Sequence, residues 1–258
     1  MIKIAIIGSG NVAQHLITAF KNSKNVEVIQ VYARHTQELE KIVAKSIIIN
    51  DISLLAKADM YLIAVTDKAI TSVSSLFPFT NRLVVHTSGS AKLQELDSKN
   101  RRGVFYPLQT FTKNKPIDFK TIPLCLESEH DTDYNIMNEV AQSISHKVYS
   151  ISSKQRQALH VAAVFVNNFV NQLYQIGHDI CIEHQISFDL LKPLIQETAH
   201  KIMTASPTLA QTGPAQRNDQ NTIDKHVSFL KNHVHQNIYI NITKAIQQNI
   251  WKEATKNK

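Results

Sequence analysis

A glycine turn close to the start of the chain constrains its fold more than any other feature. It follows an aliphatic run at 2–7 and opens an amphipathic run at 11–23. In the pattern Gly-x-Gly-x-x-Ala, the first glycine permits a tight turn and the second lets backbone approach a pyrophosphate. The small last residue lets a helix pack closely on a sheet. The motif predicts a strand, a dinucleotide-binding turn and a helix, with binding residues Gly8, Ser9, Gly10, Asn11, Val12 and Ala13.

The first half of the chain alternates short apolar runs with helix-compatible segments. Strands are expected at 26–34, 46–50, 58–65 and 82–88, and helices at 36–45 and 67–77. Apolar runs without polar alternation are typical of parallel strands covered on both faces. The pattern predicts an α/β fold with a Rossmann, doubly wound, mostly parallel sheet. Further edge strands are expected at 103–111, 121–128 and 147–152, with a helix at 131–145.

The character of the sequence changes near residue 152. Helical periodicity runs over 154–185, 188–206 and 222–254. We therefore predict a dinucleotide-binding domain at 1–152. An all-helical domain for substrate binding and dimerisation is expected at 153–258.

The end of the second predicted strand indicates which dinucleotide is bound. An NAD site usually offers a carboxylate about 20 residues beyond the glycines, but here Arg34 stands near that place. A guanidinium suits a 2′-phosphate by charge and by its bidentate fork. NADP is the predicted cofactor, with NAD as the less favoured alternative.

Residues at later strand ends are expected to border the same cofactor, because ligands of open α/β sheets bind beyond the carboxyl ends of the strands. Val65, Thr66 and Asp67 follow one strand, and Ser88 follows the next. Asp67 and Ser88 also suit a second role, as helix N-caps.

Three polar residues share one face of the first long helix of the second half. His160, Asn167 and Asn171 are spaced by seven and four. They either satisfy one another inside the core or face a polar cleft. On the cleft interpretation His160, together with His86 at a strand end, is a candidate for proton transfer. Asn167 would then orient a substrate oxygen, and Asn171 would help bind substrate.

A polar segment at 212–226 separates two helical runs. Asn221 or Thr222 can cap the second run, which leaves Arg217 and Asp219 without a local role. The two charged residues form either a surface salt bridge of little energetic worth or part of an anion-binding substrate site. The second interpretation assigns Arg217 and Asp219 to substrate binding.

Composition argues against several other classes of protein. The net charge is +7, but the basic residues are spread thinly and no nucleic-acid-binding motif accompanies them. His226, His233 and His235 lack acids or cysteines at ligand spacing, so no metal site is predicted.

The expected location is the cytoplasm. The two cysteines, Cys125 and Cys181, are far apart in the sequence and lie in apolar stretches, which predicts buried thiols in a reducing compartment. The first apolar run reaches its glycine turn too early for a signal peptide, and no run is long enough to span a bilayer. We expect neither a membrane nor a nucleic acid as a partner.

The combined pattern resembles a known family. The strings IAIIGSGNVA, VVHTSGS, GVFYPLQTF and GPAQRND look like those of bacterial Rossmann-like proteins with a helical C-terminal domain of unassigned function, described as NADP oxidoreductases. These proteins are similar in build to pyrroline-5-carboxylate reductases, deazaflavin-dependent NADP reductases and β-hydroxyacid dehydrogenases. The resemblance covers nearly the whole chain. It implies a fold and a cofactor class, but no substrate.

One departure from the last of these families concerns catalysis. β-Hydroxyacid dehydrogenases carry a catalytic lysine about one helical turn before an asparagine or an asparagine pair. Here the pair Asn167-Asn168 is preceded by AAVFV, without lysine. That chemistry is therefore not expected in its usual form.

We expect an NADP-dependent oxidoreductase that acts on a small anionic carbonyl, hydroxyl or imine compound bound between the two domains. The alternative is a non-catalytic NADP-binding sensor or scaffold protein, for which the missing lysine leaves room. The families of similar build pair through their helical domains, which implies a homodimer.

Overall fold

The computed structural model describes residues 1–256 of the chain. Its backbone forms two compact units, Met1–Asn168 and the residues from Phe169 onward, which we call the Rossmann unit and the helical unit. The start of the long helical segment, up to Asn168, groups with the Rossmann unit because its side chains pack there. The functional boundary expected after residue 152 stays a prediction.

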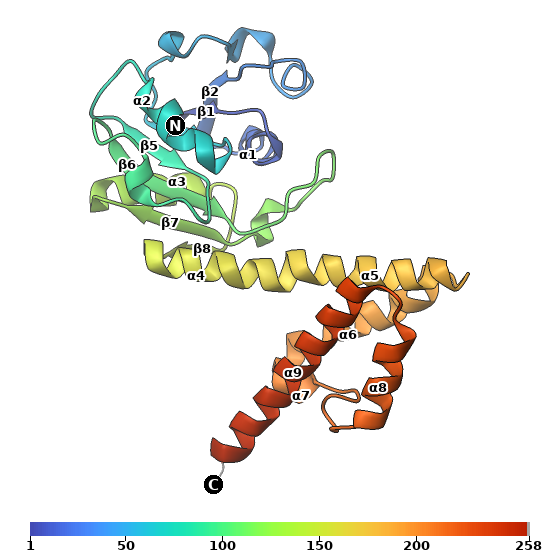
Figure 1. Cartoon of the computed structure of the whole chain (residues 1–258). Coiled ribbons are helices and arrows are strands. Elements are labelled where there is room, and N and C mark those ends of the chain that lie inside the picture. Colours follow the sequence, from blue (N-terminus) through green and yellow to red (C-terminus); the bar gives the residue numbers. More distant parts are fainter. Residues whose placement is uncertain (257–258) are drawn as a thin grey trace. The chain divides into compact units, whose positions relative to one another are not determined.

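One eight-stranded sheet forms the framework of the Rossmann unit (Figure 1). Its order is β3-β2-β1-β4-β5-β6-β7-β8, and only β6 and β7 pair antiparallel. The order reverses between β1 and β4, where a ligand crevice is expected. The strands are β1 (Ile2–Ile7), β2 (Val26–Tyr32), β3 (Ile48–Ile49), β4 (Met60–Ile63), β5 (Leu83–His86), β6 (Arg101–Pro107), β7 (Leu124–Ser128) and β8 (Val148–Ser150).

This topology confirms the predicted doubly wound, mostly parallel sheet. The three segments expected as edge strands differ in one respect. Only β8 lies at an edge, whereas β6 and β7 are flanked by strands on both sides. Both are largely buried, as interior strands should be.

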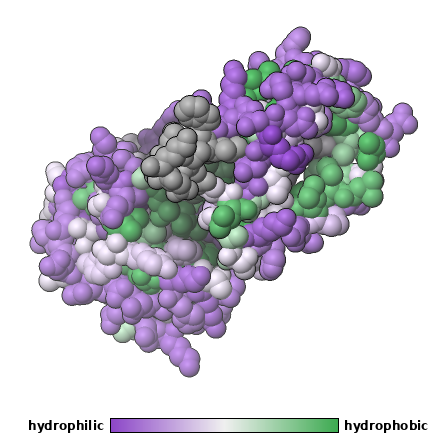
Figure 2. Space-filling view, turned by 90° about the horizontal axis from the view of Figure 1, so that it is seen from below, coloured by the Kyte–Doolittle hydropathy of each residue, from purple (hydrophilic) through white to green (hydrophobic). Residues whose placement is uncertain are grey.

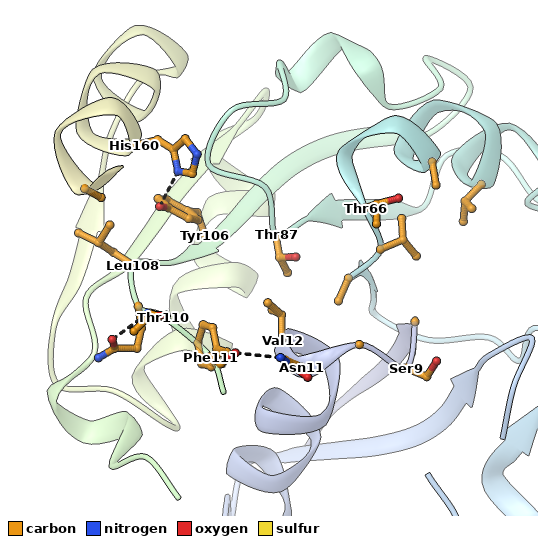
Figure 3. A pocket seen from close by; sticks show the side chains of 18 of the residues that line it. Ser9, Asn11, Val12, Thr66, Thr87, Tyr106, Leu108, Thr110, Phe111 and His160 are labelled. Carbon is orange, nitrogen blue, oxygen red and sulfur yellow. Dashed lines mark hydrogen bonds between the residues drawn. The ribbon is translucent and has the colours of Figure 1, made fainter. Parts of the chain in front are cut away.

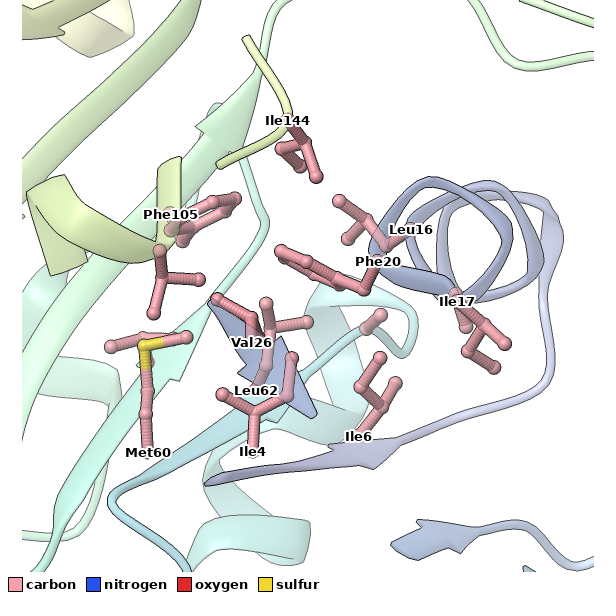
Figure 4. Close-up of a cluster of buried hydrophobic side chains, with 14 of the residues drawn as sticks. Ile4, Ile6, Leu16, Ile17, Phe20, Val26, Met60, Leu62, Phe105 and Ile144 are labelled. Atoms are coloured by element: carbon pink, nitrogen blue, oxygen red, sulfur yellow. The ribbon is translucent and has the colours of Figure 1, made fainter. Parts of the chain in front are cut away.

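Helices cover both faces of the sheet. On one face, α1 (Asn11–Lys21) buries Phe20 against Phe105 of β6 (Figure 4), and α3 (Asp131–Gln142) adds Met137 to the same cluster. The opposite face packs against α2 (Ile70–Ser75) and the first part of α4 (Ser153–Ala163), which contributes Leu159. Alternate residues of β1 enter the two clusters, as the period of a strand requires.

A π-helical segment, Val164–Phe169, joins α4 to α5 (Val170–Glu183). The remaining helices are α6 (Lys192–Thr204), α7 (Pro207–Ala210), α8 (Gln220–Phe229) and α9 (His233–Lys256). Short 3₁₀ turns occupy Lys45–Ile47, Ile52–Leu54, Asp67–Ala69, Leu93–Glu95, Phe119–Thr121 and Phe188–Leu191.

Two predictions of helices are wrong: the helix expected at 36–45 does not form, and another is interrupted. Residues 36–43 form successive turns, in which Leu39 N–H donates to Thr36 O (2.9 Å) and Val43 N–H donates to Leu39 O (2.9 Å). These turns already bury Leu39 and Val43, and so short a helix would gain little from propagation. The helix expected at 222–254 is interrupted at 230–232, where the Asn232 side chain accepts from Val234 N–H (2.8 Å) and caps α9.

No helix in the described part of the chain is both long enough and apolar enough to cross a membrane. Cys125 and Cys181 are buried, unpaired thiols, as predicted.

Candidate functional site

A cavity of about 1040 Å³ opens at the carboxyl ends of β1, β4 and β5 (Figure 3). All of its lining residues belong to the Rossmann unit. The volume is at the upper end of the range for small-molecule sites. The predicted cofactor residues that line it are Gly8, Ser9, Gly10, Asn11, Val12, Arg34, Val65 and Thr66.

The two glycines of the turn are required for different reasons. Gly8 has φ +134°, and a Cβ on it would overlap the carbonyl oxygen of Ala64 on the neighbouring strand end. Gly10 has an ordinary φ of −72°, and a Cβ there would meet no protein atom within 4 Å. The fold therefore requires Gly8, whereas Gly10 leaves room for a ligand to approach the backbone.

The start of α1 suits a phosphate group. No side chain caps this helix end and its first turn contains no acidic residue, so its N–H groups and dipole favour an anion. Ala13, the last residue of the motif, is fully buried against the sheet and does not line the cavity. That position matches its predicted role in helix packing and excludes contact with a ligand in the cavity.

Arg34 and His35 are exposed and line the same cavity. The preceding strand end is fixed beside the glycine turn, because Gly8 N–H donates to Tyr32 O (2.8 Å). Neither Asp nor Glu occurs among the lining residues. The guanidinium of Arg34 is therefore a cation on the cavity wall that could hold an anionic group of a ligand.

Tyr106 and His160 form a hydrogen-bonded pair on the cavity wall (Figure 3). Tyr106 comes from the end of β6, and His160 comes from α4. The hydroxyl oxygen of Tyr106 lies 3.1 Å from Nδ1 of His160. Burial raises the pKa of Tyr106 to about 12. A Cβ on Gly89 would overlap His160 Nδ1 and lie 2.8 Å from Tyr106 Cζ. Only glycine lets the loop after β5 lie against both rings.

A buried arginine holds that loop against α4. Arg156, one helical turn before His160, is fully buried. Its Nη1 donates to three carbonyl oxygens of the loop 88–91 at 2.7–3.1 Å, and its Nη2 donates to Glu127 Oε2 (3.2 Å). A buried guanidinium needs such partners to offset its desolvation. These hydrogen bonds of Arg156, which we call the Arg156 clamp, fix the position of Gly89 relative to His160.

His86, Asp67 and Ser88 do not line the cavity, contrary to prediction. His86 is fully buried, and its Nδ1 accepts from Ser88 N–H (3.1 Å). Burial, helped by the charge of Arg156, lowers the pKa of His86 to about 4, so the ring is neutral. Because successive side chains alternate in direction at a strand end, Thr87 reaches the cavity in its place.

The other two side chains hold loops together. Asp67 accepts from the hydroxyl of Ser90, and Ser88 Oγ accepts from Ala91 N–H (2.9 Å). Thr66 lines the cavity directly before Asp67. The structure gives Asp67 and Ser88 a local structural role in place of cofactor contact.

Asn167 lines the cavity from the π-helical segment and is exposed. Asn171, on α5 in the helical unit, is also exposed. The interpretation of these amides as a satisfied core network is therefore wrong. A π-helical turn contains more residues than an α-turn, so the spacing from His160 to Asn167 does not follow regular α-helical geometry.

Arg217 and Asp219 belong to the helical unit, and Asp219 is the N-cap of α8. Its carboxylate accepts from the N–H (3.1 Å) and hydroxyl (2.8 Å) of Thr222, and these hydrogen bonds lower the pKa of Asp219. Asp219 is thus the cap, in place of Asn221 or Thr222. Arg217 lies near enough to lower that pKa further.

Two family models match the chain. Residues 3–89 match the model described as NADP oxidoreductase, coenzyme F420-dependent, and residues 122–246 match a domain of unknown function, DUF2520. A Bacteroides fragilis protein, provisionally named an NADP oxidoreductase, is 32% identical over 96% of this chain and 98% of its own, with a TM-score of 0.84. The chain belongs to that family. We refer to it as the NADP oxidoreductase–DUF2520 family, after the two matched models.

More distant structures share the fold of the NADP oxidoreductase–DUF2520 family. A Thermotoga maritima protein is 19% identical over 97% of this chain and 99% of its own, with a TM-score of 0.75. The pyrroline carboxylate reductase of Plasmodium falciparum, solved with NADP bound, is 15% identical over 96% of both chains, with a TM-score of 0.61. No curated protein matches the sequence.

Sequence reasoning missed Tyr106 and Arg156. Tyr106 lies between the two matched regions. In the sequence, an isolated tyrosine at the end of a strand looks like an ordinary residue of the hydrophobic core. Arg156 stands in a polar helical stretch that gives no sign of burial. The conspicuous glycine after HTS was the available signal, because it marks a close approach by other side chains.

Proposed function

We propose that the protein is an NADP-dependent oxidoreductase that transfers hydride to or from a small carbonyl, hydroxyl or imine compound. One observation carries the proposal: a single cavity joins the open glycine turn and Arg34 to the Tyr106–His160 pair. Bound NADP(H) would supply hydride chemistry, and the protein would supply orientation and proton transfer.

Each part of the cavity has a role in this reaction. The N–H groups at the start of α1 would bind the pyrophosphate, and Arg34 would hold the 2′-phosphate. His160 would move a proton to or from the substrate oxygen or nitrogen. Asn167 would orient that atom through its side-chain amide.

The cofactor assignment is tested by titrating the protein with NADPH and NADH and following nicotinamide fluorescence. We expect Arg34→Asp to weaken NADPH binding at least tenfold, or about 1.4 kcal/mol, with little change for NADH. Equal losses of affinity for NADPH and NADH would show that Arg34 does not bind the 2′-phosphate. If neither nucleotide binds the unmodified protein, the proposed function fails.

Catalysis is tested by following NADPH oxidation with a panel of 2-oxo acids, imines and aldehydes. We expect His160→Gln to lower turnover on the reactive compound by roughly 10²–10⁴-fold and to leave the Kd for NADPH unchanged. Tight NADPH binding without turnover on any compound would favour the non-catalytic sensor instead.

An anionic substrate and a homodimer are parts of the same proposal. Arg217 would bind the substrate anion, so Arg217→Ala should raise KM for 2-oxo acids and leave KM for uncharged aldehydes unchanged. If both stay unchanged, the segment 212–226 is a connector.

We place the protein in the cytoplasm, where unpaired thiols stay reduced.

Exposed apolar side chains on the helical unit support pairing through that unit, because exposed apolar patches mark protein–protein interaction sites. Hydrophobic residues also reach the surface on the face drawn in Figure 2. In the described part of the helical unit, the exposed large hydrophobic residues are Phe169, Leu173, Tyr174, Ile182, Ile186, Leu190, Leu194, Ile202, Met203, Leu209, Phe229, Val234 and Ile242.

A further inference from the structure

The two ring nitrogens of His160 are not equivalent. Nδ1 lies 3.1 Å from the hydroxyl of Tyr106. A neutral imidazole has one donor and one acceptor nitrogen, and the partner of one nitrogen decides the state of the other. The direction of this one hydrogen bond therefore sets which nitrogen of His160 can donate to a substrate.

The surroundings of Tyr106 favour donation from its hydroxyl. The side chain is only 8% exposed, and its pKa of about 12 keeps the hydroxyl protonated at neutral pH. A buried hydroxyl without an acceptor is costly. In the adjacent loop, the carbonyl groups of Ser88, Gly89 and Ala91 accept from Arg156. The acceptor that the structure shows for the Tyr106 hydroxyl is Nδ1 of His160.

We propose that Tyr106 is a positioning residue for His160: it donates to Nδ1 and keeps the ring proton on Nε2. His160 then offers the substrate one defined donor. The geometry of the pair stands by itself, but its catalytic meaning rests on the proposed function.

The same hydrogen bond accounts for the proton during reduction. Hydride adds to the carbon of the C=O or C=N bond, and the oxygen or nitrogen that receives the π-electron pair takes the proton of Nε2. As Nε2 loses its proton, Nδ1 takes the hydroxyl proton of Tyr106. Nε2 then takes a proton from water and Nδ1 returns its proton to the phenolate, which restores the starting tautomer. One proton leaves water and one reaches the substrate, so the charge balances, and oxidation runs the steps in reverse.

Long-range ¹H–¹⁵N NMR of the full-length protein distinguishes the two tautomers of a neutral histidine, and His160→Gln identifies the signals of His160. We expect the Nε2–H tautomer in the unmodified protein. Tyr106→Phe keeps the ring beside Gly89 and removes only the hydroxyl. In that variant both tautomers should be populated, and kcat should fall about tenfold or more, with the Kd for NADPH unchanged.

The chain contains a matched control pair. In the helical unit, Tyr239 Oη lies 2.8 Å from Nδ1 of His226. Tyr239→Phe should alter the tautomer of His226 and leave that of His160 unchanged. A shift of the His160 signals in Tyr239→Phe would mean that the effect is not local, which would contradict the proposal.

Two further results would overturn the proposal: a proton on Nδ1 of His160 in the unmodified protein, or an unchanged tautomer in Tyr106→Phe. The first needs no variant, so it holds even if Tyr106→Phe fails to fold. Neither measurement needs cofactor or substrate. If NADPH fails to bind while the tautomers behave as expected, only the proposed function is contradicted.

Discussion

At the scale of single residues, the two glycines of the turn are expected to serve different purposes: Gly8 is required by the fold, and Gly10 by ligand binding. Alanine at position 10 keeps an allowed backbone and meets no protein atom. We expect Gly10→Ala to change the free energy of unfolding by less than about 0.5 kcal/mol and to weaken NADPH binding at least tenfold. Chemical denaturation and fluorescence titration measure the two effects.

Gly8→Ala is the matched control. Its backbone has positive φ and its new Cβ would overlap the Ala64 carbonyl, so this variant should be destabilised even without a nucleotide. If Gly10→Ala binds NADPH normally, the turn does not hold the pyrophosphate.

His86 should make stability depend on pH. Its pKa in the folded protein is about 4, below the ordinary value of 6.5. As the pH falls from about 6.5 to about 4, the unfolded chain binds a proton that the folded chain does not. The free energy of unfolding should therefore fall by about 3 kcal/mol over this window through His86 alone. Urea unfolding at several pH values measures the loss.

His86→Asn supplies the comparison, because its amide oxygen can accept from Ser88 N–H and does not titrate. Its stability should depend less on pH in this window than that of the unmodified protein. Parallel curves for the two proteins would show that His86 is not buried in neutral form.

At the scale of elements, Arg156 joins the loop 88–91 to α4 and β7. Replacing it with methionine removes the donor to three loop carbonyl groups and to Glu127 Oε2. We expect Arg156→Met to lower the free energy of unfolding by about 3–5 kcal/mol. Urea denaturation measures this directly.

Arg102→Met is the control. Arg102 Nε donates to Glu129 Oε1 (3.0 Å) in a more exposed ion pair, so its loss should cost only about 1 kcal/mol. Similar losses in the two variants would mean that the clamp contributes no more than a surface pair.

The success of prediction also differs between elements. The glycine turn was predictable because its chemistry lies within six consecutive residues. The pair of Tyr106 with His160 was not, because its members are distant in the sequence and meet only through the order of the strands. The π-helical segment keeps an α-helical pattern in the sequence, so its altered hydrogen bonds depend on tertiary packing. His86 was misplaced because the pattern did not show which way the last side chain of β5 points.

At the scale of the whole molecule, we expect a homodimer held by the helical unit. Leu194 on α6 is 62% exposed, and Leu54 in the Rossmann unit is 61% exposed. Leu194→Arg should weaken the dimer because a charge in an apolar interface is costly, whereas Leu54→Arg should not. Sedimentation velocity measures both. A monomeric unmodified protein, or equal effects of the two variants, would contradict the expectation.

The fold class was predictable at this scale, because it follows from the spacing of apolar residues and from the order of strand-like and helix-like segments. Both can be read from the sequence. The division of the backbone into compact units after Asn168 does not follow from these patterns. α4 looks like the start of the helical region, yet Arg156 and Leu159 pack it into the Rossmann unit. Only contacts between distant residues reveal that membership.

All residues that line the large cavity come from the first compact unit. The glycine turn, Arg34 and the Tyr106–His160 pair therefore lie within one compact unit. Under the proposed function, the helices after Phe169 can differ between relatives without any change in the residues that would bind the coenzyme and donate the proton. Such relatives would then differ in the compounds they recognise and share one reaction.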